Sequence, residues 1–441
     1  MPSLALHKIN IIPYASEMKK LGILLLVIVT TIAAYGVGLL RASDTVKAPD
    51  AEWALGSDTG QAWQELLVSQ EAAAARILKA TETNPQVRLE GMDMLADLLS
   101  VALEMKVDKG DPLRPAFTDW MGDYRKVFGD VGDAIYHTAE LDPRHSYVIS
   151  GNIGEVNYMG FQLYGLNPVN GWNRATENIN THDMVIAENG DFTLTLSPDS
   201  ATTGSNTLPI SNNVHMSDDV HMVMVRQYFF DRPNRDAAKF SIRRIAGDGT
   251  TPRRSAETDA LRATKIRAAT ALFNGVVDGV FAMQAMLATA PNRPDPPRRY
   301  DPDFAGIFYP TVDNEYFGTW FHIAPHEALI IEGKVPSFKD GASGYWSISL
   351  QNRWMQSLDY VDRQTSLNSR DLIVKEDGTY RMIIAHSEHF EAGQPNATIK
   401  ALMGATGNWL ETDGHQEGLL AIRYQLAESF ERPAIRMVTL E

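Results

Sequence analysis

The sequence contains no cysteine and is poor in basic residues. Its 441 residues include 40 lysines and arginines against 55 aspartates and glutamates, for a formal net charge of −15. The lack of cysteine excludes disulfides, thiolate nucleophiles and zinc–thiolate sites. The acidic balance argues against a nucleic-acid partner, because such a partner needs a basic face that neutralises its phosphates.

Several motifs of cofactor and nucleophile chemistry are also missing. The sequence has no glycine-rich phosphate loop and no dinucleotide fingerprint, so we predict no nucleotide cofactor. No serine lies in a G-x-S-x-G elbow. The nearest case, Gly341–Trp346, is interpreted as a loop.

Two histidine clusters are weak candidates for a metal site. They are His386 with Glu388 and His389, and His322 with His326. Neither matches the spacing of a known zinc motif, and strand ends commonly expose such histidines. We therefore predict that the protein holds no metal.

One long apolar run lies near the N-terminus. Residues 21–40 carry no charge and match the roughly 20 residues that a helix needs to cross a bilayer. Lys19 and Lys20 precede this run, so the positive-inside rule places residues 1–20 in the cytoplasm. We predict a single-pass anchor in the cell inner membrane with the bulk of the chain in the periplasm. A cleaved signal peptide that starts at Met18 is the alternative.

The rest of the chain, which is long enough for two or three domains, alternates between helical and strand patterns. Apolar residues recur at helical spacing over 51–140, including a short helix predicted over 124–139. Period-two alternation indicates β structure over 145–246 and again over 300–441. The segment 255–292 between them predicts a long helix that ends at a run of prolines.

The two β regions repeat each other. Asp183–Phe192 aligns without a gap on Asp371–Tyr380, at a spacing of 188 residues. Upstream, Tyr158–Leu163 matches Tyr345–Leu350. A repeat of this length indicates an internal duplication.

A third pair of segments extends the repeat toward the C-terminus. Asn206–Pro209 aligns with Asn408–Glu411, so that Trp409 replaces Thr207. We predict a mainly β fold with helical additions (α+β). It comprises two tandem antiparallel β-sandwich or jelly-roll-like domains, an N-terminal helical segment and a long connecting helix.

The second β region carries the residues that suit a small-molecule pocket. Arginine offers a planar donor fork for an acidic group, and tryptophan offers a flat face for a ring or a sugar. The candidate binding residues are Asn352, Arg353, Trp354, Tyr360, Asn408 and Trp409. The alternative is that the tryptophans belong to the sandwich core and that Arg353 pairs with Asp359 or Asp371.

Asp413 and His415 form the candidate catalytic pair. A histidine oriented by a carboxylate can act as a general base. The same T-D-G-H segment is also ordinary turn chemistry, with aspartate capping the turn and glycine taking a positive φ. Both interpretations stay open at the level of the sequence.

The segments that carry a family resemblance are Arg88–Met105, Asp133–Asn152, Tyr345–Tyr360, Ser366–Asp371, Glu376–His386 and Gly407–Gly418. Through them, most of the chain after the apolar run resembles a bacterial family known as domain of unknown function 1214 (DUF1214). The resemblance implies a β-sandwich fold and no settled chemistry. A step that is often Asn-Pro-Asp in the family falls within Gly129–Asp133 here.

These observations lead to two functional hypotheses. The first is a membrane-anchored envelope enzyme or accessory protein whose second β domain holds a small organic or hydrophobic substrate in a pocket. The second is a non-catalytic module that binds a glycan or a partner protein. An enzyme needs His415 at the floor of a concave pocket, within hydrogen-bond reach of a carboxylate.

Overall fold

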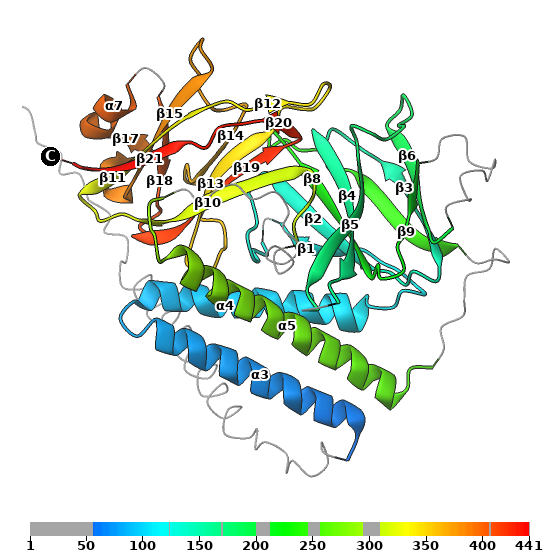
Figure 1. The fold of residues 1–441 in the computed structure, drawn as a ribbon. Helices are drawn as coiled ribbons and strands as arrows, with labels where there is room; N and C mark the ends of the chain where they lie inside the picture. Colours follow the sequence, from blue (N-terminus) through cyan, green and yellow to red (C-terminus); the bar gives the residue numbers. More distant parts are fainter. Residues whose placement is uncertain are drawn as a thin grey trace, which may run out of the picture.

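The computed structural model describes residues 56–122, 124–168, 171–199, 212–245, 256–293, 309–404 and 407–440. The predicted anchor at 21–40 and the repeat segment at 206–209 lie outside these ranges. The described chain forms two β units side by side over a layer of helices (Figure 1). This arrangement confirms the predicted α+β fold, which is mainly β with helical additions.

The helical layer consists of three long helices, all begun by side-chain caps. The side-chain oxygens of Ser57, Asn84 and Thr258 each accept a backbone N–H from the first helical turn. A π-helical turn, η1 (Glu104–Asp108), follows the second of them. The three helices are α3 (Asp58–Ala80), α4 (Pro85–Leu103) and α5 (Asp259–Leu287).

Helix α5 is the connecting helix expected over 255–292. It is long and apolar enough to cross a membrane by length and composition. It packs, however, against α3 and α4, and buries Phe273, Val277 and Val280 on that side. A core helix of a soluble protein passes the same test, so α5 is weak evidence for a membrane span.

The helix predicted over 124–139 is wrong. Its second half forms β2 (Ala134–Glu140), which pairs with β1 (Thr118–Met121) on one side and β8 (Met222–Tyr228) on the other. Isoleucine, tyrosine and threonine favour this strand, and two partner strands satisfy its backbone. The first β unit therefore begins before residue 145.

The first unit is a sandwich of two sheets. Their strand orders are β1-β2-β8-β4-β5 and β7-β6-β3-β9. Apolar side chains from both sheets, such as Ile149, Phe161 and Leu194, form the core between them. The remaining strands are β3 (Ser146–Asn152), β4 (Tyr158–Leu166), β5 (Asn173–Asn180), β6 (Asp191–Ser197), β7 (Asn212–His215) and β9 (Lys239–Ile245).

The second unit repeats this architecture. Its strand orders are β10-β19-β13-β14 and β18-β15-β11-β21, so each strand has a counterpart at the same place in the first unit. The shared order confirms the predicted duplication. The strands are β10 (Asn314–His322), β11 (Glu327–Lys334), β13 (Trp346–Gln351), β14 (Ser366–Asn368), β15 (Thr379–Ala385), β18 (Asn408–Glu411), β19 (Glu417–Gln425) and β21 (Ala434–Thr439). Smaller additions are β12 (Ser337–Phe338), β20 (Ala427–Ser429), η3 (Ser387–His389), β16 (Phe390–Glu391), β17 (Gln394–Pro395) and α7 (Ala397–Met403).

The units are not purely antiparallel as predicted. In each unit one short edge strand, β7 or β18, runs parallel to its neighbour β6 or β15. These edge strands also correct the alignment at Asn206. Asn212 Oδ1 accepts the Val185 N–H at 2.8 Å, and Asn408 Oδ1 accepts the Ile373 N–H at 2.8 Å. The counterpart of Asn408 is therefore Asn212, because the loops before the two strands differ in length.

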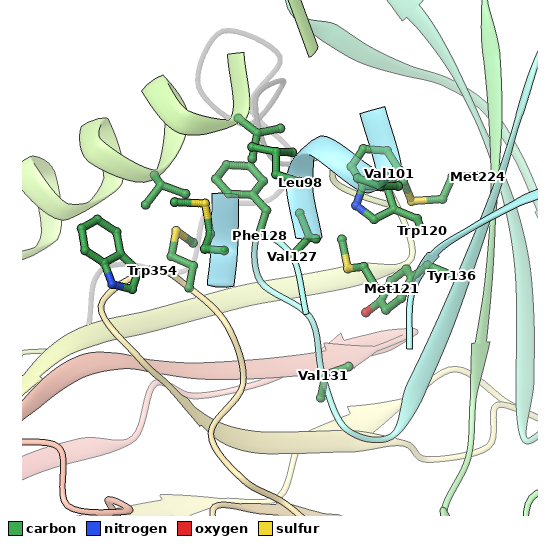
Figure 2. Close-up of a cluster of buried hydrophobic side chains, with 14 of the residues drawn as sticks. Leu98, Val101, Trp120, Met121, Val127, Phe128, Val131, Tyr136, Met224 and Trp354 are labelled. Carbon is green, nitrogen blue, oxygen red and sulfur yellow. The ribbon is translucent and has the colours of Figure 1, made fainter. Parts of the chain in front are cut away.

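One core cluster joins the helices to both β units. It combines α4 residues such as Leu98 with Met224 of the first unit and Trp354 of the second (Figure 2). At Gly91, the backbone of α4 approaches α3 and the second unit closely. An added Cβ there would lie 2.6 Å from Ile77 Cγ2 and 2.9 Å from Trp354 Cε2. The helical layer thus holds the two units in a fixed relation.

Candidate functional site

The two β units contact each other through hydrogen-bonded polar residues at equivalent positions. Asp313 lies directly before β10 of the second unit. Its Oδ2 accepts hydrogen bonds from the Tyr158 hydroxyl at 2.5 Å and from Asn180 Nδ2 at 3.1 Å, both in the first unit. The start of the second unit is therefore held by the first.

The reverse contact uses the matching residues. Asp133 lies directly before β2, and its Oδ2 accepts hydrogen bonds from the Tyr345 hydroxyl and from Asn368 Nδ2, both at 3.2 Å. Tyr345 and Asn368 occupy the places in the second unit that Tyr158 and Asn180 occupy in the first. The junction thus has approximate two-fold symmetry.

A pair of buried arginines follows the same symmetry. Arg226 on β8 donates to the carbonyl of Tyr309, and Arg423 on β19 donates to the carbonyl of Gly129. Their exposed fractions are 4% and 7%. Each arginine donates to a backbone carbonyl in the segment that leads into β10 or β2 of the other unit. These charge-assisted hydrogen bonds fix the position of each unit relative to the other.

A pocket of about 880 Å³ opens at the Asp133 end of this junction. Residues from both units and from the segment before β2 line it, with arginine and aspartate side chains of both charge signs. We call it the junction pocket. Its lining residues are Tyr124, Gly132, Asp133, Phe230, Asp231, Arg232, Pro233, Arg235, Tyr360, Val361, Ser366, Asn368, Arg370 and Asp371.

Asp133 forms a buried part of this lining and is 8% exposed. Burial raises its pKa to about 6, while the hydrogen bonds from Asn368 and Tyr345 act in the opposite direction. A carboxyl group that titrates near neutral pH inside a pocket is a common feature of functional sites.

Tyr360 supplies the aromatic surface of the junction pocket. The Arg232 guanidinium lies 3.6 Å from the centre of its ring, and Lys126 Nζ lies 4.6 Å from it. The ring packs on Gly132, where an added Cβ would come within 2.9 Å of ring atoms. The π face of the ring attracts both cationic side chains, and together with the Gly132 contact they fix the orientation of the ring.

A second pocket of about 530 Å³ shares Tyr360 and Ser366 with the junction pocket. It also contains the predicted binding residues Asn408 and Trp409. The amide of Asn408 is engaged in the strand contacts described above, and Trp409 is stacked on Phe390 at a ring distance of 4.7 Å. Both residues therefore support the wall of this pocket.

A third pocket of about 410 Å³ lies against α4 and shares Tyr124 with the junction pocket. Asn352, Asp413 and His415 line it, as the catalytic hypothesis requires. The carboxylate bonded to the histidine is, however, Glu90 rather than Asp413: His415 Nε2 lies 2.7 Å from Glu90 Oε1.

His415 has no ring nitrogen left for a substrate. Its Nδ1 lies 3.0 Å from the carbonyl oxygen of Thr412, and its Nε2 faces Glu90. Burial lowers the pKa of His415, but the contacts with Glu90, Thr412 and Asp413 outweigh burial and leave the pKa above its usual value. Two acceptors favour the doubly protonated imidazolium, which is not a general base.

Asp413 is bonded to an arginine. Its Oδ1 lies 2.7 Å from Arg363 Nε, and burial raises its pKa despite that charge. Gly414 has a φ of +79°, as the turn interpretation of this segment anticipated, and Asp413 itself has a φ of +50°.

Arg353 and Trp354 line none of these three pockets. Arg353 contacts Glu417 at 3.4 Å rather than either predicted aspartate. Trp354 is fully buried, and its indole N–H donates to the Val87 carbonyl of α4 at 2.6 Å. Asn352 Oδ1 accepts the Trp354 N–H at 2.9 Å and shapes the turn between them.

The histidine clusters show no metal geometry. Among the described residues, no group of three or more His, Asp and Glu side chains could hold a metal ion. His386 Nε2 faces the carbonyl of Gly414 at 3.2 Å, and His389 Nε2 faces that of Pro325 at 2.6 Å.

Asp133 and the arginines of the junction pocket are absent from the site predicted from the sequence. A signal for both exists in the repeat. The pattern D-x-x-Y begins at Asp133 and at Asp313, and F-[DE]-R-P begins at Phe230 and at Phe430. Residues repeated at equivalent positions of a duplication can meet at the junction between its halves, and the first pattern does so here.

No protein-family model matches the chain, and no curated protein does. Among solved structures, an uncharacterised protein from Burkholderia cenocepacia is similar at 26% identity and a TM-score of 0.72, over 88% of this chain and 99% of that one. A protein from Vibrio parahaemolyticus aligns over 79% of this chain and 97% of its own, at 10% identity and a TM-score of 0.45. The chain thus shares its overall fold with the Burkholderia cenocepacia protein, whose description states no function.

Proposed function

We propose that this chain is a binding protein for a small polar molecule, held in the junction pocket against Tyr360 and above Asp133. The observation that supports this most is the pocket itself, about 880 Å³ in volume and built by both units. It combines a buried carboxyl group with a fixed aromatic face. Concave sites with a few converging polar groups are typical of ligand binding.

The lining favours a polar ligand over a hydrophobic one. Three arginines and three aspartates contribute to it, so positive and negative groups are balanced. Such a surface suits a zwitterionic or a hydroxyl-rich molecule, because each charged group of the ligand finds an opposite partner.

Binding is favoured over catalysis by the state of His415. Both of its ring nitrogens face acceptor oxygens, so removal of a substrate proton would first require the Glu90 contact to break. The nearby Asp413 is paired with Arg363 and does not orient the imidazole.

We also propose that residues 21–40 anchor the chain in the inner membrane and place the two units in the periplasm. The uncharged run of suitable length behind Lys19 and Lys20 supports this location. Membership of the DUF1214 family is part of the same proposal and depends on the sequence segments that resemble it.

The test is a binding screen of the full chain in detergent. The protein is incubated with a small-molecule extract, bound compounds are identified by mass spectrometry, and their Kd values are measured on wild type and variants. We expect Arg232→Gln and Tyr360→Ala each to raise the Kd by about tenfold or more, since each removes a side chain that lines the pocket.

The matched control is Arg144→Gln, which changes an exposed arginine paired with Asp142 outside the pocket. It should leave the Kd unchanged. Equal Kd values for wild type and Arg232→Gln would show that the ligand does not bind in the junction pocket. A compound that is consumed by wild type and spared by His415→Ala would instead establish an enzyme.

A further inference from the structure

The two halves of the duplication differ at a position beside Asp133 and Asp313. Asn178 on β5 lies opposite Gln162 of β4, and Ser366 on β14 lies opposite Ser349 of β13. Asn178 lies two residues before Asn180, and Ser366 lies two residues before the equivalent Asn368. Ser366 is therefore the counterpart of Asn178. Their spacing of 188 residues is the spacing found for the repeat in the sequence.

In the first unit this position supplies a third hydrogen bond to the aspartate. Asn178 Nδ2 donates to Asp313 Oδ2 at 2.7 Å, in addition to the bonds from Tyr158 and Asn180. A primary amide thus occupies the space beside the Asp313 carboxylate.

In the second unit the corresponding space has no amide. Asp133 Oδ2 is bonded to Tyr345 and Asn368, and the serine side chain has two fewer heavy atoms than that of asparagine. The Ser366 hydroxyl oxygen is buried, and no partner for it occurs among the residues that the structure describes. Both Ser366 and Asp133 line the junction pocket.

We infer that the junction pocket contains a subsite for a primary amide or amine, whose N–H donates to Asp133 where the Asn178 amide would lie in the other half. The inference rests on the proposed function of the pocket and names the ligand class. The Ser366 hydroxyl provides a second polar contact for the same head group. A carboxylate is excluded from the subsite, because it offers no donor and repels the aspartate.

The test fills the subsite with the protein's own side chain. In Ser366→Asn the new amide should donate to Asp133, as Asn178 does to Asp313. Acetamide and methylammonium serve as probes and are titrated into the full chain in detergent by ligand-observed NMR. We expect both to bind wild type and to bind Ser366→Asn at least tenfold more weakly.

Two further measurements do not depend on the probes binding. Ser366→Asn should raise Tm by about 2 °C, because a buried carboxyl group gains a donor. The reciprocal variant Asn178→Ser should lower Tm, because Asp313 loses one. If neither variant changes Tm, the third donor is unimportant and the inference is wrong.

Acetate is the negative probe, since it has the shape of acetamide without the N–H group. It should not displace acetamide from wild type. Should Ser366→Asn fail to fold, Ser366→Ala replaces it, and this variant should weaken acetamide binding about threefold through loss of the hydroxyl contact.

Failure of this inference can be distinguished from failure of the proposed function. If acetamide binds Ser366→Asn as tightly as wild type while Arg232→Gln still loses the pocket ligand, the subsite is wrong and the pocket stands. If Arg232→Gln leaves ligand binding intact, the pocket itself is wrong.

Discussion

His415 shows how a residue that suits catalysis can serve to join two parts of a fold. It lies in the turn before β19, and its imidazole contacts Glu90 on α4 in a largely buried ion pair, with side-chain exposures of 8% and 13%. The pair links the second β unit to the helical layer. Its contribution to stability must therefore depend on the protonation of the imidazole.

We expect His415→Gln to destabilise the protein in a pH-dependent way. The folded-state pKa of His415 is raised, so the ion pair stabilises the fold fully below the unfolded pKa of about 6.5. This stabilisation is lost as the pH rises through the folded-state pKa. The substitution should lower the free energy of unfolding by roughly 2 kcal/mol near pH 6 and by clearly less near pH 9, as measured by urea unfolding.

Two variants control for this effect. Glu90→Gln should show the same pH dependence, because it removes the other half of the pair. His322→Gln alters an exposed residue at the end of β10 and should leave the wild-type profile unchanged. A loss that is equal at all pH values would mean that packing, rather than charge, explains the role of His415.

At the scale of elements, the three long helices were predictable from the sequence, whereas the strands β1 and β2 and the short helix α7 were not. Each of α3, α4 and α5 begins at a cap residue and carries apolar residues at helical spacing, which are signals local to the helix. A proline also marks the start of α4, and another follows the end of α5. Strand β2 depends on pairing with β1 and with β8, which is nearly 90 residues further along the chain. Its neighbours in sequence therefore do not reveal it.

The docking of α4 makes an element-scale prediction. Gly91→Val places a branched side chain where a single Cβ would already lie 2.6 Å from Ile77 and 2.9 Å from Trp354. The helix must move away from α3 and from the second unit. We expect a loss of about 3 kcal/mol or more in the free energy of unfolding, measured by chemical denaturation.

Gly275 on α5 provides the matched control. An added Cβ there would meet no atom within 4 Å, so Gly275→Ala should stabilise the protein by up to about 1 kcal/mol through helix propensity. If Gly91→Val is tolerated as well as Gly275→Ala, the close contact between α4 and Trp354 is not important for stability.

At the scale of the whole molecule, the duplicated units are held by reciprocal contacts rather than by a linker alone. Arg226 and Arg423 each donate to the segment that leads into β10 or β2 of the other unit. Asp133 and Asp313 lie in these segments and each accept hydrogen bonds from a tyrosine and an asparagine of the other unit. Loss of one buried contact should therefore affect both units.

We expect Arg226→Met to lower hydrogen-exchange protection in both β units. The substitution leaves the Tyr309 carbonyl and the Tyr164 hydroxyl without the donor that they share. The loss of stability should be about 3 kcal/mol, read from the exchange rates of β8 and of β10 by mass spectrometry. Faster exchange confined to the first unit would show that the two units open independently.

The sequence by itself determined the helical layer, the repeat and the β-rich class of the fold. Periodicity, capping and turn preferences act between neighbours in the chain, so a single sequence displays them. The repeat also carried the signal of the junction, in the matching patterns at Asp133 and Asp313.

Only the tertiary structure decided which residues share a pocket. Asp133, Arg232 and Tyr360 are each more than 95 residues from the next along the chain, and the packing of two units over the helices brings them together. The same packing buries Trp354 in the core and places His415 next to Glu90. Burial and non-local partners set the role of these side chains, and both arise from contacts that the order of residues does not specify locally.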